Sequence, residues 1–282
     1  MPVSKICIRI GLILAVLALL IFVIMQVIRI IAQPRLFHPS RDDSAHQAML
    51  KNASMEYIVI PTDQGELSGF LFRQNDGPAP LLLYYGGNSD NAASVLRRLT
   101  STRRGTFQGW NVAMIDYPGY GLSEGTPGDA AFRRMALAAY DTFAAREDVT
   151  QIVVMGYSIG TGPASYAASQ RPVDGLILMA PYAEGADLFN TVLDVFYGPL
   201  KLLISYPMPS IRFARDVAVR PLIFATEQDE LVPYASSQRL ESAYPNGCDF
   251  VTVPGIGHGG FWDSGMVLNG IADYLNRAAR AE

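Results

Sequence analysis

The stretch VVMGYSIGTG, residues 153–162, decides how the rest of the chain is interpreted. A run of β-forming residues stops at Gly156, and Ser158 stands between Gly156 and Gly160 in the pattern G-x-S-x-G. In that pattern the serine occupies a sharp turn between a strand and a helix, and its hydroxyl projects above the sheet. Small residues on either side avoid collisions with the neighbouring strand and helix. The stretch therefore predicts a nucleophile elbow with Ser158 as the nucleophile.

A phosphate-binding loop is the main alternative for a glycine-rich stretch that follows a strand. The pattern G-x-x-x-x-G-K-[ST] is absent, and no lysine lies nearby. Gly160 and Gly162 fill the first two places of the dinucleotide pattern G-x-G-x-x-G. Its third place falls on Ser165, and Pro163 intrudes. The sequence therefore argues against a nucleotide site, and we assign Gly162 to close packing of the following helix.

A serine hydroxyl is a poor nucleophile unless a base removes its proton. Only one histidine, His258, lies downstream of Ser158, in VPGIGHGGFW after the last predicted strand. The acid should come between them in the chain, in the loop EQDELVP that follows the strand PLIFAT. We predict Asp229 for this role, which is to hold the imidazole in the correct tautomer. Glu227 and Glu230 remain close alternatives, because the sequence does not determine side-chain direction.

The tetrahedral intermediate of such a reaction needs backbone N–H donors. We expect one donor at Ile159, directly after the nucleophile, and the other in the loop GGNSDN (86–91) after a buried strand. This chemistry needs neither a metal nor an organic cofactor. Cys7 and Cys248 match no metal-ligand spacing, and no disulfide between them is expected, because Cys7 precedes an apolar run.

The chain alternates strands and helices from its third predicted strand onward, which indicates a mostly parallel sheet with helices on both faces. The strands are predicted over 56–60, 66–72, 81–85, 111–116, 151–155, 175–179, 221–226 and 249–253. Helices are predicted over 129–146 and in the closing segment 261–282. The net charge of −4 gives no indication of nucleic-acid binding.

A long interval without a strand separates Met179 from Pro221. Its stretch 185–206 is helical in pattern and rich in large apolar residues. We predict one or two helices there, which lie over the edge of the sheet as a cap at about 182–215. Such a cap commonly lines a substrate pocket; the alternative is a packed excursion without a role in specificity.

The N-terminal part of the chain is predicted to be a membrane element. Residues 10–28 carry no charge, and as a helix they would span roughly 28 Å, close to the bilayer core of about 30 Å. A cleaved signal peptide is the alternative, but the run is long and the nearest cleavage site is poor. We predict a signal anchor over 1–31, in a cell membrane, with the large domain on the extracytoplasmic side.

A juxtamembrane linker is predicted over 32–54 and a catalytic domain over 55–282. The linker contains two prolines and several charged residues and shows no sustained period. His38 and His46 both fall in it, and we expect them to be solvated.

Five motifs of this chain resemble the α/β-hydrolase superfamily. They are YYGGNSDN, DYPGYGLSEGTP, GYSIGTG, EQDELVP and GIGHGGFW, in that order over roughly residues 56–280. Within the superfamily the chain is most similar to a membrane-anchored branch, the Bem46-like proteins and the ABHD13- and ABHD17-type serine hydrolases. The apolar N-terminal segment agrees with that branch.

The resemblance implies a hydrolase with a triad of Ser158, His258 and Asp229, and it places the second oxyanion donor at the Asn88 backbone N–H. Two positions depart from the family's pattern. Gly86 stands where a histidine is usual, and Pro118 stands where an arginine is common. We expect these changes to affect the support of the loops more than the chemistry.

These observations predict a membrane-tethered serine hydrolase that cleaves carboxylic esters or thioesters through an acyl-enzyme. Acyl-lipids or acylated proteins are the expected substrates, because the anchor confines the enzyme to a surface. An amidase or aminopeptidase-like peptidase is the alternative, and three acidic residues of the cap, Glu184, Asp187 and Asp194, would suit a free amine. A non-catalytic binding protein on the same fold is less favoured, because such proteins usually lose the serine or the histidine. The sequence does not indicate an oligomeric state.

Overall fold

A single eight-stranded sheet forms the centre of the molecule. The structure, a computed structural model, describes residues 3–191 and 194–280. The strand order is β1-β2-β4-β3-β5-β6-β7-β8. The strands are β1 (Met55–Thr62), β2 (Gly65–Phe72), β3 (Ala79–Tyr85), β4 (Asn111–Ile115), β5 (Val149–Tyr157), β6 (Gly175–Met179), β7 (Leu222–Ala225) and β8 (Asp249–Thr252). The eight predicted strands are thus confirmed.

Most of the sheet is parallel, as predicted. Strands β1 and β2 form an antiparallel hairpin, and β2 is antiparallel to β4. Every later pair, from β3·β4 to β7·β8, is parallel. Strands β4 and β6 are buried along their whole length. Strands that are buried on both faces consist of continuous apolar runs. The sequence therefore shows such runs there, and not an alternation of apolar and polar residues.

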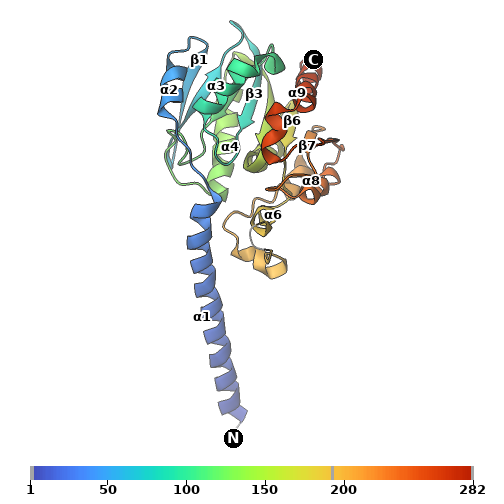
Figure 1. Cartoon of the computed structure of the whole chain (residues 1–282). Coiled ribbons are helices and arrows are strands. Elements are labelled where there is room, and N and C mark those ends of the chain that lie inside the picture. Colours follow the sequence, from blue (N-terminus) through green and yellow to red (C-terminus); the bar gives the residue numbers. More distant parts are fainter. Residues whose placement is uncertain (1–2, 192–193, 281–282) are drawn as a thin grey trace.

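Helices cover the sheet on both faces. The helices on one face are α4 (Asp129–Ala144), α5 (Thr161–Gln170), α7 (Ser210–Phe213) and α8 (Tyr234–Glu241) (Figure 1). The helices on the other face are α3 (Ala92–Thr102) and α9 (Gly265–Ala278), and the 3-10 turn η1 (Arg104–Phe107) lies between them. Helix α3 is absent from the sequence-based prediction. Its buried Ala92, Val95, Leu96 and Leu99 follow the i, i+3, i+4, i+7 spacing that identifies an amphipathic helix.

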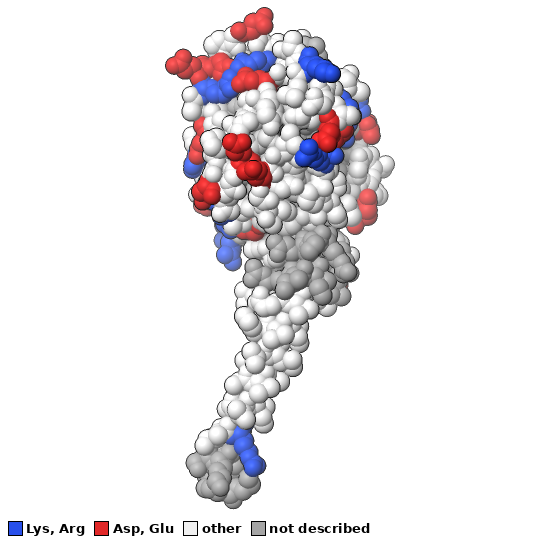
Figure 2. Space-filling view, turned by 90° about the vertical axis from the view of Figure 1, so that its left-hand side faces the viewer, with Lys and Arg blue, Asp and Glu red and all other residues white. Residues whose placement is uncertain are grey.

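The N-terminal helix α1 (Val3–Leu36) projects from the domain as a long rod, with the N-terminus at its far end (Figure 1). Its segment Cys7–Ile24 is long and apolar enough to cross a membrane, and it is exposed throughout; a signal sequence would share these properties. Figure 2 shows the described side chains of this rod as almost entirely uncharged. The helix continues five residues beyond the predicted boundary at residue 31.

The segment after α1, within the predicted linker 32–54, packs against the domain body. Phe37 is buried, and its ring packs against Phe132 and Tyr206, with ring centroids 5.2 and 5.5 Å away. A short helix, α2 (Asp43–Leu50), buries Met49, and the residue before it, Asp42, is its N-cap, whose carboxylate accepts the Ala45 N–H at 2.9 Å. A helix of two turns is too short to show a clear period in the sequence.

Both linker histidines make contacts that the sequence did not predict. The His46 ring meets Tyr57 and Phe70 edge-on, with centroids 5.2 and 5.1 Å away. Partial burial lowers the pKa of His46. His38 is exposed, but its backbone N–H donates to the Asn88 side chain at 3.2 Å. The segment after α1 is therefore attached to the domain body.

The cap, for which the sequence predicts one or two helices, contains two short helical segments. Within 185–206 the described residues form only α6 (Gly185–Asn190) and the 3-10 turn η3 (Gly198–Leu203). Gly198 has a φ of +51°, and Pro199 follows it, so a continuous helix is broken at this point. Ala186, Phe196 and Ile204 form a small hydrophobic core of their own inside the cap.

Asp116, directly after β4, joins the sheet to α3. Its Oδ1 accepts the Ala92 N–H at 2.6 Å, and burial raises the pKa of this carboxyl from 3.8 to about 7. The folded state therefore retains a proton between about pH 4 and pH 7 that the unfolded state has lost. The stabilising effect of this proton is fully present below about pH 4, and it disappears as the pH rises through 7.

Asp116→Asn is expected to remove this pH dependence. Between pH 5 and pH 8 the wild type should lose roughly 2–4 kcal/mol of unfolding free energy relative to the variant. Thermal unfolding of the full chain in detergent at both pH values measures the difference. Asp273→Asn, at an exposed position of α9, is the control and should behave like the wild type. Parallel pH profiles for the wild type and Asp116→Asn would contradict the assignment.

Candidate active site

The loops that carry the predicted site residues follow the carboxyl ends of β3, β5, β7 and β8. Because these strands are parallel, their carboxyl ends lie at one edge of the sheet. Ligands of open α/β sheets bind at this edge. The fold therefore brings together residues that lie up to 170 positions apart, from Asn88 to His258.

Ser158 lies at a strained turn between β5 and α5. Its φ is +53°, in the left-handed region that costs free energy for a residue with a side chain. A Cβ added at Gly156 would lie 2.6 Å from the Gly160 carbonyl oxygen. A Cβ added at Gly160 would lie 2.2 Å from the Tyr85 carbonyl oxygen, on β3. Both glycines are thus required by close backbone contacts.

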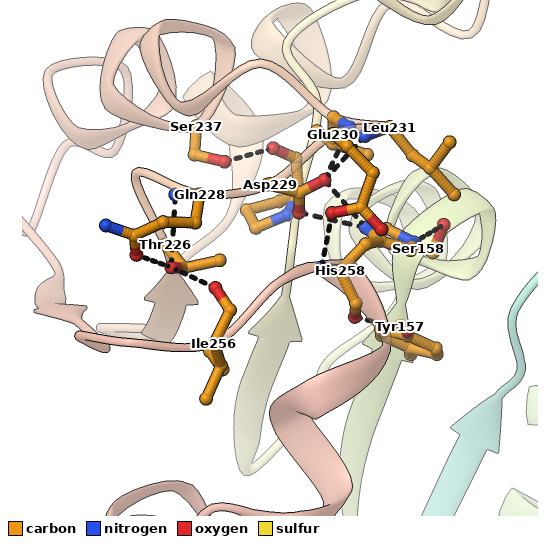
Figure 3. A network of polar contacts seen from close by, with 12 residues as sticks. Tyr157, Ser158, Thr226, Gln228, Asp229, Glu230, Leu231, Ser237, Ile256 and His258 are labelled. Carbon is orange, nitrogen blue, oxygen red and sulfur yellow. Dashed lines mark hydrogen bonds and ion pairs between the residues drawn. The ribbon is translucent and has the colours of Figure 1, made fainter.

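His258 bridges Ser158 and Asp229 (Figure 3). The His258 Nε2 is 2.9 Å from the Ser158 Oγ, and its Nδ1 is 2.9 Å from both carboxylate oxygens of Asp229. The side chains of His258 and Asp229 are only 8% and 2% exposed. An ionised carboxylate only accepts hydrogen bonds, so Nδ1 carries the proton and Nε2 is left to accept the serine proton.

Asp229 is the acid that contacts the imidazole, and the two alternatives lie elsewhere. Glu230 accepts the backbone N–H of His258 at 3.0 Å, and Glu227 is exposed. The Asp229 Oδ1 also accepts the backbone N–H groups of Leu231 and Val232, at 2.9 and 2.7 Å. These bonds orient the carboxylate toward the histidine.

Tyr157 supports the histidine, which the sequence did not predict. Its hydroxyl donates to the His258 carbonyl oxygen at 2.7 Å, and the two rings stack with centroids 5.3 Å apart (Figure 3). Tyr157 is the first variable position of G-x-S-x-G, so the motif itself carries no signal for this role. Together with Glu230, it holds His258 by both of its backbone polar groups.

The loop GGNSDN is held without the family's usual histidine. Tyr117 donates from its hydroxyl to the Gly86 carbonyl oxygen at 2.8 Å, and the Gly87 N–H donates to Asp90 at 2.7 Å. Burial raises the pKa of Asp90. A Cβ at Gly86 would lie 2.6 Å from the Met114 side chain and 2.8 Å from that of Asp90, so a histidine has no room here.

The side chain of Asn88 joins this loop to the end of α1. Its Nδ2 donates to the Leu36 carbonyl oxygen at 2.6 Å and lies 3.0 Å from the His38 Nδ1. Its Oδ1 accepts the Tyr120 hydroxyl at 2.9 Å and the His38 backbone N–H at 3.2 Å. The sequence gave no signal for this contact, because Leu36 and His38 lie 50 or more positions away.

One pocket lies above Ser158, between the end of α1 and the cap. Four of the residues predicted for the site, Asn88, Ser158, Ile159 and His258, line it, whereas Asp229 lies behind the histidine. The remaining lining residues are Leu36, His38, Gly87, Ser89, Asp90, Tyr157, Leu188, Thr191, Leu231 and Val232. Residues of α1 and α6 thus form walls of the pocket. Among the residues that the structure describes, no group of three or more histidine, cysteine or acidic side chains is arranged to hold a metal ion.

Comparison with known proteins identifies the same fold. A family model described as "alpha/beta hydrolase fold" matches residues 80–207, and one described as "TAP-like protein" matches residues 206–281. An uncharacterized protein of Mycobacterium tuberculosis is 29% identical over 249 residues, which cover 86% of this chain and 87% of that protein.

One curated relative has a name that states an activity, and a solved structure has a similar fold. The lysophosphatidylserine lipase ABHD12 of Rattus norvegicus is 28% identical over 183 residues, which cover 57% of this chain but only 44% of the lipase. Among solved structures, Est1E from Butyrivibrio proteoclasticus superposes with a TM-score of 0.61 at 19% identity and covers 79% of this chain and 99% of its own. At this identity, the match with Est1E shows the fold alone.

The contact between Gly160 and Tyr85 generates a stability prediction. Gly160→Ala is expected to lower the unfolding free energy by about 1–3 kcal/mol or more, because the added methyl group would overlap the β3 backbone. Thermal unfolding of the full chain in detergent measures this. Gly265→Ala is the matched control, since a Cβ there meets nothing within 4 Å. Equal melting temperatures for the two variants would contradict the elbow geometry.

Proposed function

Because this chain belongs to the α/β-hydrolase superfamily, we propose that it is a membrane-tethered serine hydrolase that cleaves carboxylic esters or thioesters. The observation that carries the proposal is the continuous contact from Ser158 through His258 to Asp229, at 2.9 Å on both sides of the imidazole. The same contact sequence, from serine through histidine to aspartate, performs acyl transfer on unrelated folds, although the three residues follow other orders along those chains.

In the proposed reaction, His258 Nε2 removes the Ser158 proton while the Oγ attacks the substrate carbonyl carbon. Asp229 stabilises the imidazolium that forms and keeps the Nδ1 proton in place. The imidazolium then donates its proton to the leaving alcohol or thiol, and an acyl-serine remains. Water, activated by the same histidine, attacks the acyl carbon and releases the acid.

The negative charge of the tetrahedral intermediate is proposed to bind the backbone N–H groups of Ile159 and Asn88. Ile159 stands at the start of the 3-10 turn η2 (Ser158–Gly160), which leads into α5, and N–H groups at a helix start favour negative charge. Asn88 lines the pocket, and its four side-chain contacts hold its backbone in place. Asn88 is therefore proposed to have two functions: its backbone N–H binds the oxyanion, and its side-chain amide holds that backbone in place.

The pocket favours an ester with an apolar acyl group over a peptide. Leu36, Leu188, Leu231 and Val232 contribute apolar side chains to its wall. A relative of this chain is named a lysophosphatidylserine lipase, and acyl-lipid esters are the proposed substrate class.

The acidic residues of the cap do not support an aminopeptidase. Glu184 pairs with Lys201, Asp187 pairs with Arg239, and Asp194 accepts the Tyr197 hydroxyl. None of the three acids lines the pocket. A site for a substrate ammonium group would need a carboxylate that is free and directed into the pocket.

Helix α1 is proposed to be an uncleaved membrane anchor, with the domain on the extracytoplasmic side. Its exposed apolar segment Cys7–Ile24 supports the anchor. The mature protein is expected to retain α1 by mass and to stay in the membrane pellet after carbonate extraction. Protease added to intact cells should digest the domain. Release of a shortened protein into the soluble fraction would show a cleaved signal peptide.

Substitution of the proposed triad tests the reaction. A fluorophosphonate probe should label the wild type but not Ser158→Ala. On p-nitrophenyl esters, Ser158→Ala and His258→Ala should lower kcat on the order of 10⁶-fold, and Asp229→Asn roughly 10⁴-fold. Glu227→Gln, in the same loop but exposed, is the matched control and should retain full activity. Faster turnover of amino-acid arylamides than of the esters would favour a peptidase.

Asn88→Ala tests the support of the oxyanion loop. This variant keeps the proposed backbone donor but loses the contacts with Leu36, His38 and Tyr120. We expect kcat to fall by about 10–100-fold with little change in KM, because the donor is displaced and remains present. Ser89→Ala changes an exposed pocket residue next to it and should leave kcat unchanged. An unaltered kcat in Asn88→Ala would contradict a positioning role for the amide.

A further inference from the structure

The outer surface of the cap is unusually apolar. Four large side chains project from it into solvent: Val195 (41% exposed), Tyr197 (58%), Leu200 (47%) and Leu202 (79%). We call these four residues the cap ridge. They do not belong to an unfolded segment, because their neighbours Phe196 and Ile204 are buried in the cap's own small core. Residues 195–204 therefore have one face that packs against the cap core and one face that is exposed to solvent.

The cap ridge lies beside the helix proposed to enter the membrane. The turn η3, which carries Leu200 and Leu202, contacts α1. In Figure 1 the cap hangs below the domain, alongside the domain-proximal part of α1. The uncharged apolar run of α1 extends to residue 28, and the helix ends at Leu36, about 12 Å further at 1.5 Å per residue. Because η3 contacts α1 and the cap lies alongside the domain-proximal part of that helix, we expect the cap ridge near the part of α1 that would cross the headgroup layer.

The charges of this segment do not oppose contact with lipid. Lys201 is the one charged residue between 195 and 204, and its ammonium is paired with Glu184. Asp194, just before the ridge, accepts the Tyr197 hydroxyl. A tyrosine beside leucines suits the membrane interface, where the ring meets apolar chains and the hydroxyl remains in a polar layer.

We propose that the cap ridge inserts into the interfacial layer of the bilayer that holds α1, as a second membrane contact of the domain. The inference rests on the proposed anchoring of α1 and does not depend on the proposed hydrolase chemistry. Leu188 and Thr191 of the cap and Leu36 of α1 line the same pocket. The mouth of the pocket would then open at the membrane surface, so that an acyl chain could pass from the bilayer toward Ser158.

A fluorescent probe on the cap ridge tests the contact. The full chain with Cys7→Ser, Cys248→Ser and Leu202→Cys is labelled with an environment-sensitive NBD dye and placed in phosphatidylcholine nanodiscs. The lipids carry a nitroxide quencher either near the headgroup or near the end of the acyl chain. Two controls use the same background: Leu17→Cys in the apolar segment of α1, and Met266→Cys, which is 50% exposed on α9 at a distance from the membrane helix.

The proposal expects blue-shifted emission at position 202, quenched more strongly by the nitroxide near the headgroup. The Met266→Cys probe should be neither shifted nor quenched, and the Leu17→Cys probe should be quenched most by the deep nitroxide. An unquenched probe at position 202 beside a quenched Leu17→Cys probe would overturn the proposal and leave the anchor intact. An unquenched Leu17→Cys probe would overturn the anchor itself. Blue-shifted emission at 202 without quenching would mean that protein, such as a second copy of the chain, covers the ridge, which also overturns the proposal.

A kinetic comparison tests the consequence for substrate entry. In nanodiscs, Leu200→Ser with Leu202→Ser is expected to lower turnover of a long-chain ester dissolved in the bilayer by about tenfold. Turnover of a soluble short-chain ester should not change, because neither residue lines the pocket. Met266→Ser is the matched control for loss of an exposed apolar side chain. Equal turnover of the long-chain ester by the wild type and the double variant would overturn the proposed entry route.

Discussion

The contact between the elbow and strand β3 is the constraint on which the rest of the site depends. Gly160 lies so close to the Tyr85 and Gly86 carbonyl groups that even one methyl group would overlap them. This contact places Ser158, at the end of β5, directly beside the loop that starts at Gly86. The proposed nucleophile and the proposed oxyanion donors are therefore positioned by one backbone contact, before any side-chain hydrogen bond is considered. The strained φ of Ser158 follows from the same sharp turn.

The other two proposed triad residues are positioned by backbone groups as well. Asp229 accepts two N–H groups of its own loop, and His258 is held through its N–H by Glu230 and through its carbonyl by Tyr157. His258 is thus fixed through its backbone, which leaves both ring nitrogens free, and Asp229 is fixed through the carboxylate oxygen Oδ1 that also faces the imidazole. This is the arrangement expected of a preorganised site, in which the geometry is set before the substrate arrives.

The end of α1 is part of the site as well as the proposed link to the membrane. Phe37 is buried against Phe132 and Tyr206, and the carbonyl of Leu36 accepts a hydrogen bond from Asn88. The helix and the oxyanion loop are thereby joined through a single amide. This connection explains how the loop remains ordered although Gly86 replaces the usual histidine, since its support comes from Asn88, Asp90 and Tyr117.

The sequence by itself determined the strands, the elbow, the order of serine and histidine, and the apolar helix, because each depends on local periodicity or on residues close together in the chain. It left the acid open among Asp229, Glu227 and Glu230, and it missed α2, α3 and the attachment of residues 37–50. Only the tertiary structure decided that Asp229 faces His258 and that Asn88 contacts Leu36. The physical reason is that side-chain direction depends on packing between segments that here are 29 and 52 positions apart, and no local pattern records it.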